Sequence, residues 1–179
     1  MSVPDHDAPL ETMWQGEFIT AYTRGRWEFV GRARGIRAAV ILAVENGHVV
    51  LVEQYRVPLG RACLELPAGL IGDEGDPDEA AEAAGARELE EETGYRAARM
   101  ETIGEFFSSP GMVSESFTLV KATGLTRVSE GGGAGDEDIT VHRVPLAEIA
   151  AFVAARRAAG VAVDVKVLLL LAETILAGA

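Results

Sequence analysis

The sequence is poor in cysteine and in positive charge, and each shortage argues against a class of protein. Cys63 is the only cysteine among 179 residues, so no disulfide can form within the chain and a reducing compartment is its simplest home. We expect Cys63 to pack as a small core residue. The formal net charge of −12 argues against a nucleic-acid backbone or an anionic membrane as the main partner.

The sequence also lacks a long apolar run. The most apolar stretch, 165–172, is too short to span a bilayer and is followed by Glu173, so we expect a buried helix there. The first residues have neither a basic start nor an apolar core, and we therefore expect no secretory signal and a cytoplasmic location. With 48% apolar and 25% charged residues, the composition is that of an ordinary globular protein.

Alternating apolar residues predict strands in the first third of the chain. We expect residues 1–13 to form a loosely held N-terminus, and 14–22 and 27–34 to form a hairpin within an N-terminal extension at 14–36. The main domain is expected to cover 37–179. It begins with two apolar, β-branched runs, at 37–45 and 48–56, that are joined by the strong hairpin signal Asn46-Gly47.

Later segments mix predicted strands and helices. We expect strands at 96–107, 116–122 and 139–144, and helices at 145–159 and 164–176. Between them, 126–138 is rich in glycine and acidic residues. Because few contacts would hold such a stretch, we expect it to move as a lid. It has neither the lysine nor the Ser/Thr of a P-loop, so we do not expect it to cradle phosphate.

The segment 79–95, EAAEAAGARELEEETGY, is predicted to be helical because start and stop signals flank it. Asp76 can cap the first turn, Pro77 suits the first helical position, and Gly94 suits the residue after the last turn.

Three carboxylates share one face of this predicted helix. At about 100° per residue, Glu88, Glu91 and Glu92 fall within an arc of about 100°, whereas Glu90 points to the far side. Like charges this close raise one another's pKa unless a cation neutralises them, and oxygen ligands suit Mg²⁺ or Mn²⁺. We expect these groups at an exposed site outside the packed core. The alternative is an acidic face that serves only solubility.

The residues around these carboxylates resemble the Nudix box. Glu79, seven further residues and then RELEEETGY at 87–95 fit the pattern Glu, seven residues, Arg-Glu-aliphatic-x-Glu-Glu-x-Gly-apolar. The opening glycine of the pattern would fall at Asp73, whereas its counterpart here is Gly69, four residues earlier. We interpret this difference as a short insertion at 72–75. The resemblance implies a Nudix α/β/α sandwich with a mixed sheet and an N-terminal β-hairpin extension.

Further segments resemble the ADP-ribose pyrophosphatase branch of the Nudix superfamily. They are Trp27-Glu28 with Arg32, QYR at 54–56, ELPAG at 65–69, and SPG at 109–111 followed by Glu115. This branch implies a Mg²⁺-dependent pyrophosphatase, with Mn²⁺ as the alternative ion, that hydrolyses a nucleoside diphosphate sugar to a nucleoside monophosphate and a sugar phosphate.

The substrate stays open at this point. VDVK at 163–166 is similar to ADP-ribose hydrolases, which makes ADP-ribose the first candidate, whereas GGG with DEDI at 131–139 resembles GDP-mannose hydrolases. A nucleoside triphosphate housecleaning activity is the third candidate. Outside the enzyme class, the chain could be a non-catalytic sensor of nucleotide sugars on an inherited Nudix scaffold.

The resemblance also assigns roles to individual residues. Metal ligands are expected at Glu88, Glu91, Glu92 and the backbone carbonyl of Ala68. The catalytic base is expected on the mobile loop at Glu137, with Asp136 and Asp138 as rivals and Glu91 as the candidate within the box.

Phosphate contacts are expected from Arg32 and Arg56, since a guanidinium matches two phosphate oxygens, and Glu115 is expected near the terminal sugar. Arg87 is expected to be structural and to fix the junction of loop and helix.

The aromatic residues offer a means to bind a nucleobase. Trp14 and Trp27 are the available stacking partners for a flat base, and Glu28 accompanies Trp27 as a substrate contact. In the resembled branch, the N-terminal strands often reach across a homodimer, so we expect a homodimer in which the tryptophans serve the neighbouring subunit's site. The alternative is that both tryptophans are structural anchors.

Overall fold

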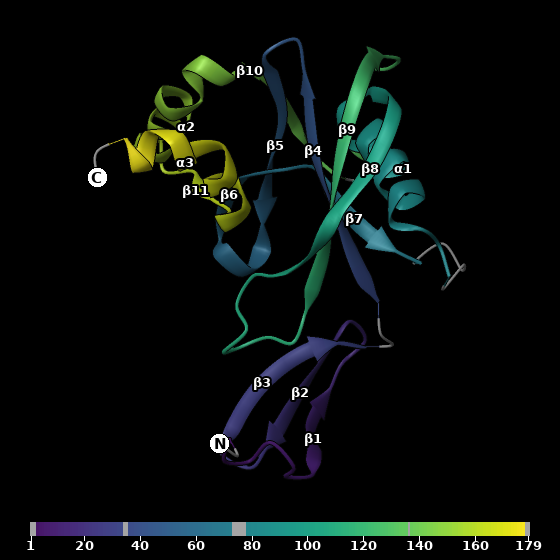
Figure 1. The fold of residues 1–179 in the computed structure, drawn as a ribbon, viewed down its shortest axis with the longest axis vertical. Coiled ribbons are helices and arrows are strands. Elements are labelled where there is room, and N and C mark those ends of the chain that lie inside the picture. The colour runs from purple at the N-terminus through teal and green to yellow at the C-terminus, as the bar shows by residue number, and fades with distance from the viewer. Residues whose placement is uncertain (1–2, 34–35, 73–77, 136, 178–179) are drawn as a thin grey trace.

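The computed structural model describes residues 3–33, 36–72, 78–135 and 137–177, and it shows two sheets (Figure 1). The N-terminal sheet has three antiparallel strands, and the following sheet has eight strands of mixed direction with helices on both sides. The α/β/α sandwich expected from the sequence is therefore confirmed. No helix of the described residues is long and apolar enough to cross a bilayer.

The first sheet contains β1 (Leu10–Gln15), β2 (Ile19–Arg24) and β3 (Trp27–Arg32). The second contains β4 (Arg37–Glu45), β5 (His48–Arg56), β6 (Arg61–Glu65), β7 (Ala68–Ile71), β8 (Tyr95–Phe107), β9 (Ser116–Arg127), β10 (Thr140–Pro145) and β11 (Ala162–Val163). The helices are α1 (Ala81–Thr93), α2 (Ile149–Ala158) and α3 (Leu168–Leu176). Short 3-10 turns lie at η2 (Val57–Leu59), η3 (Leu146–Glu148) and η4 (Val165–Val167).

The β4–β5 hairpin divides the large sheet into two halves. The two strands pair only beside their turn, at Val44 with Val49 and at Glu45 with His48. Beyond that point, β4 pairs with β7 and with β9, whereas β5 pairs with β6 and β10. The strands therefore diverge and leave space between the halves for a cavity.

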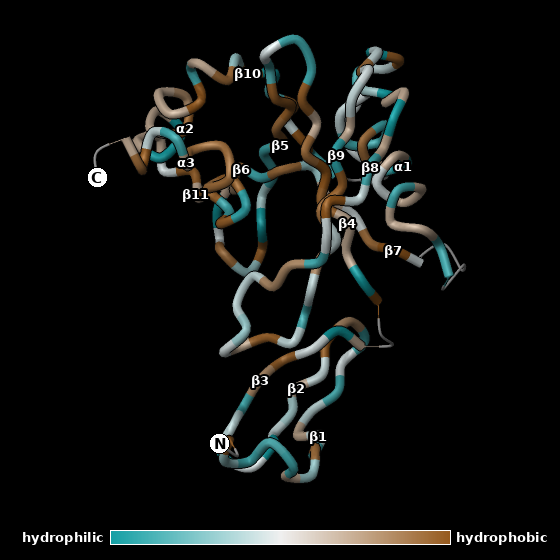
Figure 2. Tube along the Cα trace, in the orientation of Figure 1, coloured by the Kyte–Doolittle hydropathy of each residue, from teal (hydrophilic) through white to brown (hydrophobic). Residues whose placement is uncertain are grey.

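Alternation along the central strands explains the helical layers. Val49 and Leu51 of β5 belong to the core that α2 covers, whereas Val50 faces a second core beside Leu89 of α1. Figure 2 shows apolar residues concentrated along β4 and β5. A strand that is buried on both faces has a nearly continuous apolar sequence, and both β4 and β5 have this pattern.

The N-terminal sheet has three strands where we expected two. β1 begins at Leu10, inside the segment for which we expected a loosely held chain, and β1 and β2 replace the single strand predicted at 14–22. The sheet contacts the loop after β8, because Val30 accepts a hydrogen bond from the N–H of Ser114 (2.9 Å) and donates one to the carbonyl of Met112 (3.0 Å).

Helix boundaries differ from those predicted. α1 begins at Ala81 after an N-cap at Ala80 that makes no side-chain hydrogen bond, so the start predicted at 76–77 is wrong. Asp76, Pro77 and most of the predicted insertion at 72–75 lie outside the described residues. The last two helices each begin with a 3-10 turn, so α2 and α3 start later than expected.

The expectation that 165–172 forms a buried helix is wrong for most of the segment. No residue of α3 is buried, and Leu168 and Leu169 are about half exposed. Leu170 and Leu171 pack partly against the core, and Val167 of η4 is fully buried. Apart from Lys166 the run is apolar, but only part of it packs against the core.

Candidate active site

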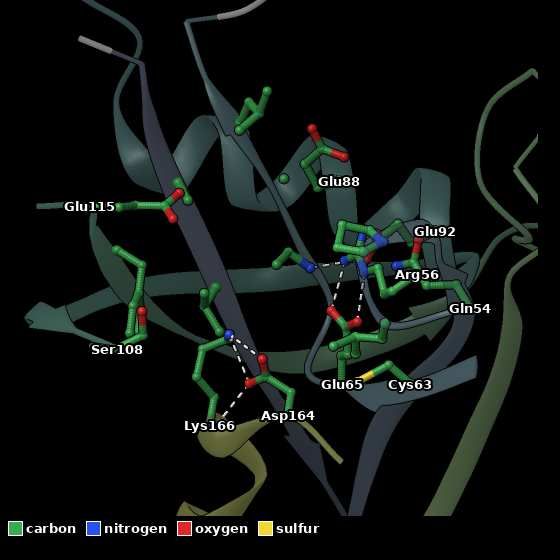
Figure 3. Close-up of a pocket in the computed structure, with 18 of the residues that line it drawn as sticks. Gln54, Arg56, Cys63, Glu65, Glu88, Glu92, Ser108, Glu115, Asp164 and Lys166 are labelled. Carbon is green, nitrogen blue, oxygen red and sulfur yellow. Dashed lines mark hydrogen bonds and ion pairs between the residues drawn. The ribbon is translucent and has the colours of Figure 1, made fainter. Parts of the chain in front are cut away.

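A cavity of about 610 Å³ lies between the two halves of the large sheet (Figure 3). Its walls come from β3, β4, β5, β6, β7, β9 and α1, from η2 and η4, and from the loops that carry Ser108, Glu115 and Glu137. The volume falls within the range typical of small-molecule sites, about 300–1,000 Å³. Most of the residues singled out from the sequence line this cavity: Arg32, Arg56, Ala68, Glu88, Glu92, Glu115 and Glu137.

Glu92 is the most deeply placed carboxylate of the cavity. Its side chain projects from the last turn of α1 and accepts a hydrogen bond from the backbone N–H of Ala68 (3.0 Å). The residue is only 5% exposed, so the expectation of an exposed site is wrong for Glu92. Burial, together with the nearby charges of Glu88 and Glu137, raises the pKa of Glu92 to about 8.

Glu88 lies one helical turn before Glu92 and depends on a glycine opposite. A Cβ built on Gly69 would lie 1.9 Å from Cδ of Glu88, so any larger residue at 69 would displace this carboxylate. Gly69 is the residue we took as the counterpart of the box's opening glycine, and this close approach is a physical reason for glycine there.

Arg87 joins α1 to the strand before it, as expected. Its guanidinium donates to the carbonyl of Leu70 (3.3 Å) and to Oε1 of Glu88 (2.8 Å), and lies 3.7 Å from Oε2 of Glu79. These contacts fix β7, the chain just before α1 and the Glu88 carboxylate relative to one another.

Glu91 does not line the cavity. Its side chain is 41% exposed and its Oε2 lies 3.6 Å from NH1 of Arg87. The structure thus brings two of the three carboxylates of the helix face, Glu88 and Glu92, together in the cavity.

Each cation of the cavity lies beside an acid. Nε and NH2 of Arg56 donate to the two carboxylate oxygens of Glu65, both at 2.7 Å. Nε of Arg32 donates to Glu115 (2.7 Å), which joins β3 to the segment before β9.

The third pair is Lys166 with Asp164, two residues for which the sequence predicted no individual role. Nζ of Lys166 lies 2.7 Å from Oδ1 of Asp164 and 5.5 Å from the ring centroid of Phe117. Glu65 was likewise quoted only as part of a motif. Asp164 caps the 3-10 turn η4. An aspartate is a common capping residue, so Asp164 followed two residues later by Lys166 was the sequence signal that could have pointed to this pair.

Glu137 reaches the cavity from the loop between β9 and β10. Its Oε2 accepts a hydrogen bond from the N–H of Ala134 (3.0 Å). Of the rival acids, Asp138 does not line the cavity and Asp136 lies outside the described residues. The expectation that few contacts hold this stretch is wrong for its middle, where Gly132 and Gly133 donate hydrogen bonds to the end of α1.

Trp14, Trp27 and Glu28 lie away from the cavity within one chain. They belong to β1 and β3 of the N-terminal sheet, where Trp14 is 57% and Trp27 54% exposed. Trp27 lines a separate hollow of about 230 Å³ together with Pro110.

The charges of the cavity suit a hard cation. Six carboxylates line it, those of Glu65, Glu88, Glu92, Glu115, Glu137 and Asp164, against three cations, those of Arg32, Arg56 and Lys166. Among the residues that the structure describes, no three acidic, histidine or cysteine side chains form a ready-made ligand cluster. The donors are nonetheless oxygens with an excess of negative charge, which is the set that Mg²⁺ or Mn²⁺ prefers.

Cys63 also lines the cavity but is not a thiolate. It is 3% exposed, and burial followed by the charge of Glu65 raises the pKa of its thiol to about 12. The thiol therefore stays neutral at physiological pH and adds no charge to the cavity.

We expect Cys63 to resist alkylation in the folded protein. A pKa of about 12 leaves roughly one thiol in 10⁴ ionised at pH 8, at least 10²-fold less than for an ordinary cysteine. Mass spectrometry after iodoacetamide treatment should find an unmodified folded chain and a fully modified chain in urea. Rapid modification without urea would contradict this account.

Comparisons with known proteins show the family of the chain. The NUDIX domain model matches residues 33–164. The ADP-ribose pyrophosphatase of Mycobacterium tuberculosis is 36% identical over 113 residues, 63% of this chain and 53% of that protein. The GDP-mannose pyrophosphatase of Cronobacter sakazakii is 39% identical over 125 residues, 64% of this chain and 62% of that protein. The methanol dehydrogenase activator of Bacillus methanolicus is 40% identical over 108 residues, 60% and 56% of the two chains.

The chain spans little more than half the length of the Mycobacterium tuberculosis and Bacillus methanolicus relatives, and 62% of the Cronobacter sakazakii relative. A crystal structure of an ADP compounds hydrolase superposes with a TM-score of 0.69 over 95% of this chain and 93% of that chain, at 24% identity. This likeness confirms the fold. Since the family model matches well over half of the sequence, the chain belongs to the NUDIX domain family.

Proposed function

We propose that the chain is a Mg²⁺-dependent pyrophosphatase that hydrolyses a nucleoside diphosphate sugar, with ADP-ribose as the first substrate. The products are a nucleoside monophosphate and a sugar phosphate. The observation that carries this proposal is that Glu88 and Glu92 of the matched helix line one cavity with Arg32 and Arg56. The carboxyl groups of Glu88 and Glu92, which can attract a cation, thus share one cavity with the guanidinium groups of Arg32 and Arg56, which can bind phosphate directly.

The arginines retain donors for phosphate although each is paired. Arg56 uses Nε and NH2 on Glu65, so its NH1 group is free of that carboxylate. A guanidinium has five N–H donors, and a phosphate can accept those that remain. The carboxylate partners hold the side chains in place before a substrate binds.

Glu88 and Glu92 are the residues of the cavity that would hold Mg²⁺, together with a backbone oxygen of Ala68, and Glu91 is the further candidate from the same helix. When bound, Mg²⁺ neutralises phosphate charge and lowers the pKa of the attacking water. Glu137 accepts the proton of that water as it attacks phosphorus, and the sugar phosphate or nucleoside monophosphate leaves.

A panel of nucleotide sugars tests the proposal. ADP-ribose, GDP-mannose and a nucleoside triphosphate, each with Mg²⁺ and with EDTA, should be compared by phosphate release after coupling to a phosphatase. We expect metal-dependent release that is fastest from ADP-ribose. GDP-mannose is the second candidate because one relative is a GDP-mannose pyrophosphatase. Binding of a nucleotide sugar without turnover would instead favour a sensor.

We further propose a homodimer in which Trp27 stacks on the base in the neighbouring subunit's site. Trp27→Ala should then raise KM more than it lowers kcat, since stacking aids the ground and transition states alike. Phe18→Ala is the matched control, because Phe18 is an equally exposed aromatic residue beside the same sheet (59% exposed). Loss of the dimer in Trp27→Ala, measured by light scattering, would assign this tryptophan a structural role.

A further inference from the structure

The glycine-rich segment before Glu137 is hydrogen-bonded to the C-terminal end of α1. The last four carbonyls of a helix have no partner within the helix. Here the N–H of Gly132 donates to the carbonyl of Glu92 (2.8 Å), and the N–H of Gly133 donates to the carbonyl of Glu91 (3.1 Å). The loop backbone is thus joined directly to the turn of α1 that carries the buried carboxylate.

Gly131 lets the two backbones approach this closely. A Cβ at this position would lie 2.4 Å from the carbonyl carbon of Thr93 and 2.6 Å from the nitrogen of Gly94. These are backbone atoms of the helix end, which cannot move aside as a side chain can. Gly131 also has a φ of +68°, so two independent features require glycine there.

The same segment also fixes the Glu137 side chain. A Cβ at Gly133 would lie 2.5 Å from Oε2 of Glu137, the oxygen that accepts the Ala134 hydrogen bond. On the far side of Glu137, Ile139 is buried and donates its N–H to the carbonyl of Gly132 (3.3 Å). The carboxylate is therefore held between two anchored points of the chain.

We propose that Gly131 and Gly133 are positioning residues that set the place of the Glu137 carboxylate relative to Glu92. The inference rests on the proposed function, in which Glu137 is the base. In this arrangement, base and buried carboxylate belong to one unit, since the loop that carries Glu137 is hydrogen-bonded to the backbone of Glu92 itself. If Gly131 and Gly133 only allowed the loop to pack against the end of α1, their substitution would not affect proton transfer to Glu137.

The test is kinetic and compares three glycines of the loop. Gly131→Ala and Gly133→Ala should each lower kcat, on the order of 10²-fold, with little change in KM, because displacement of a reacting group by about 1 Å can cost that much. Gly135→Ala is the matched control: Gly135 also has a positive φ, +63°, but apart from its chain neighbours no atom of the described residues lies within 4 Å of its Cβ position. It shares the backbone strain without the collision and should keep kcat.

A double-mutant cycle separates positioning from a general effect on folding. If the glycines act through Glu137, Gly131→Ala should add no further loss to Glu137→Gln. Loss of kcat in Glu137→Gln with normal kcat in both glycine variants would overturn this inference alone. Normal kcat in Glu137→Gln would overturn the base assignment and this inference with it.

Hydrogen exchange gives a readout that does not depend on activity. The amides of Gly132 and Gly133 should exchange slowly in the native chain and in Gly135→Ala, because both donate hydrogen bonds to α1. In Gly131→Ala they should exchange rapidly while the amides of α1 remain protected. Rapid exchange in the native chain would show that the loop is not docked and would overturn the inference. Gly133→Ala, which collides with a side chain, serves if Gly131→Ala does not fold.

Discussion

Glu92→Gln is expected to lower kcat by about 10³-fold or more, which corresponds to about 4 kcal/mol of transition-state stabilisation. The substitution keeps the shape of the side chain and an oxygen that can accept the hydrogen bond from the Ala68 N–H. It removes the negative charge that a divalent cation requires. Steady-state kinetics at increasing Mg²⁺ would measure the effect, and activity restored at saturating Mg²⁺ would contradict the assignment of Glu92 as a ligand.

The same variant should fold normally without metal. Glu92 is buried beside Glu88, and its raised pKa of about 8 leaves it mostly protonated at pH 7 without metal, so the neutral amide of glutamine replaces a neutral acid at little cost. In thermal melts, Mg²⁺ should raise the Tm of the native chain but not that of Glu92→Gln, since a ligand stabilises only the protein that binds it. Glu90→Gln is the control: Glu90 pairs with Arg96 at the surface and should keep both activity and the shift.

Glu137→Gln is expected to lower kcat and kcat/KM together by a factor on the order of 10² to 10⁴, with little change in KM or Mg²⁺ affinity. A base acts mainly in the transition state, and an amide cannot accept the proton of the attacking water. The pattern to look for is therefore a kcat effect without a binding effect.

Asp138→Asn provides the comparison for Glu137. Asp138 is the next residue in the chain and does not line the cavity, so its loss should leave kcat nearly unchanged. If Glu137→Gln, Asp138→Asn and Asp136→Asn all keep near-normal kcat, the base lies elsewhere, and Glu91 of the helix becomes the leading candidate, to be tested by Glu91→Gln.

Local sequence signals predicted the central elements well. The Asn46-Gly47 turn is present between β4 and β5, with φ values of +50° and +71°, and Gly94 ends α1 in the left-handed conformation. These predictions succeeded because each depends on a few adjacent residues. The helical period likewise placed Glu88 and Glu92 on the face that lines the cavity.

Features that depend on contacts between distant residues could not be predicted from local sequence patterns. Periodicity placed Glu91 on the same face as Glu92, but the Glu91 side chain is 41% exposed outside the cavity, with its carboxylate 3.6 Å from NH1 of Arg87. Glu92 is buried because β7 lies against the helix end, which helical spacing cannot reveal. Lys166 and Asp164 are near neighbours in the sequence, but their position at the cavity depends on the parallel pairing of β11 with β6, which no local signal predicts.

The arrangement of strands around β4 also determines when the protein can fold. β4 pairs in parallel with β9, whose residues lie about 80 positions later in the sequence. Contacts this remote require closure of a long loop before they contribute stability, so topologies of this kind fold slowly. During synthesis, β4 must wait for residues as far as Ala122 to emerge, and until then its apolar edge is open to association with other chains.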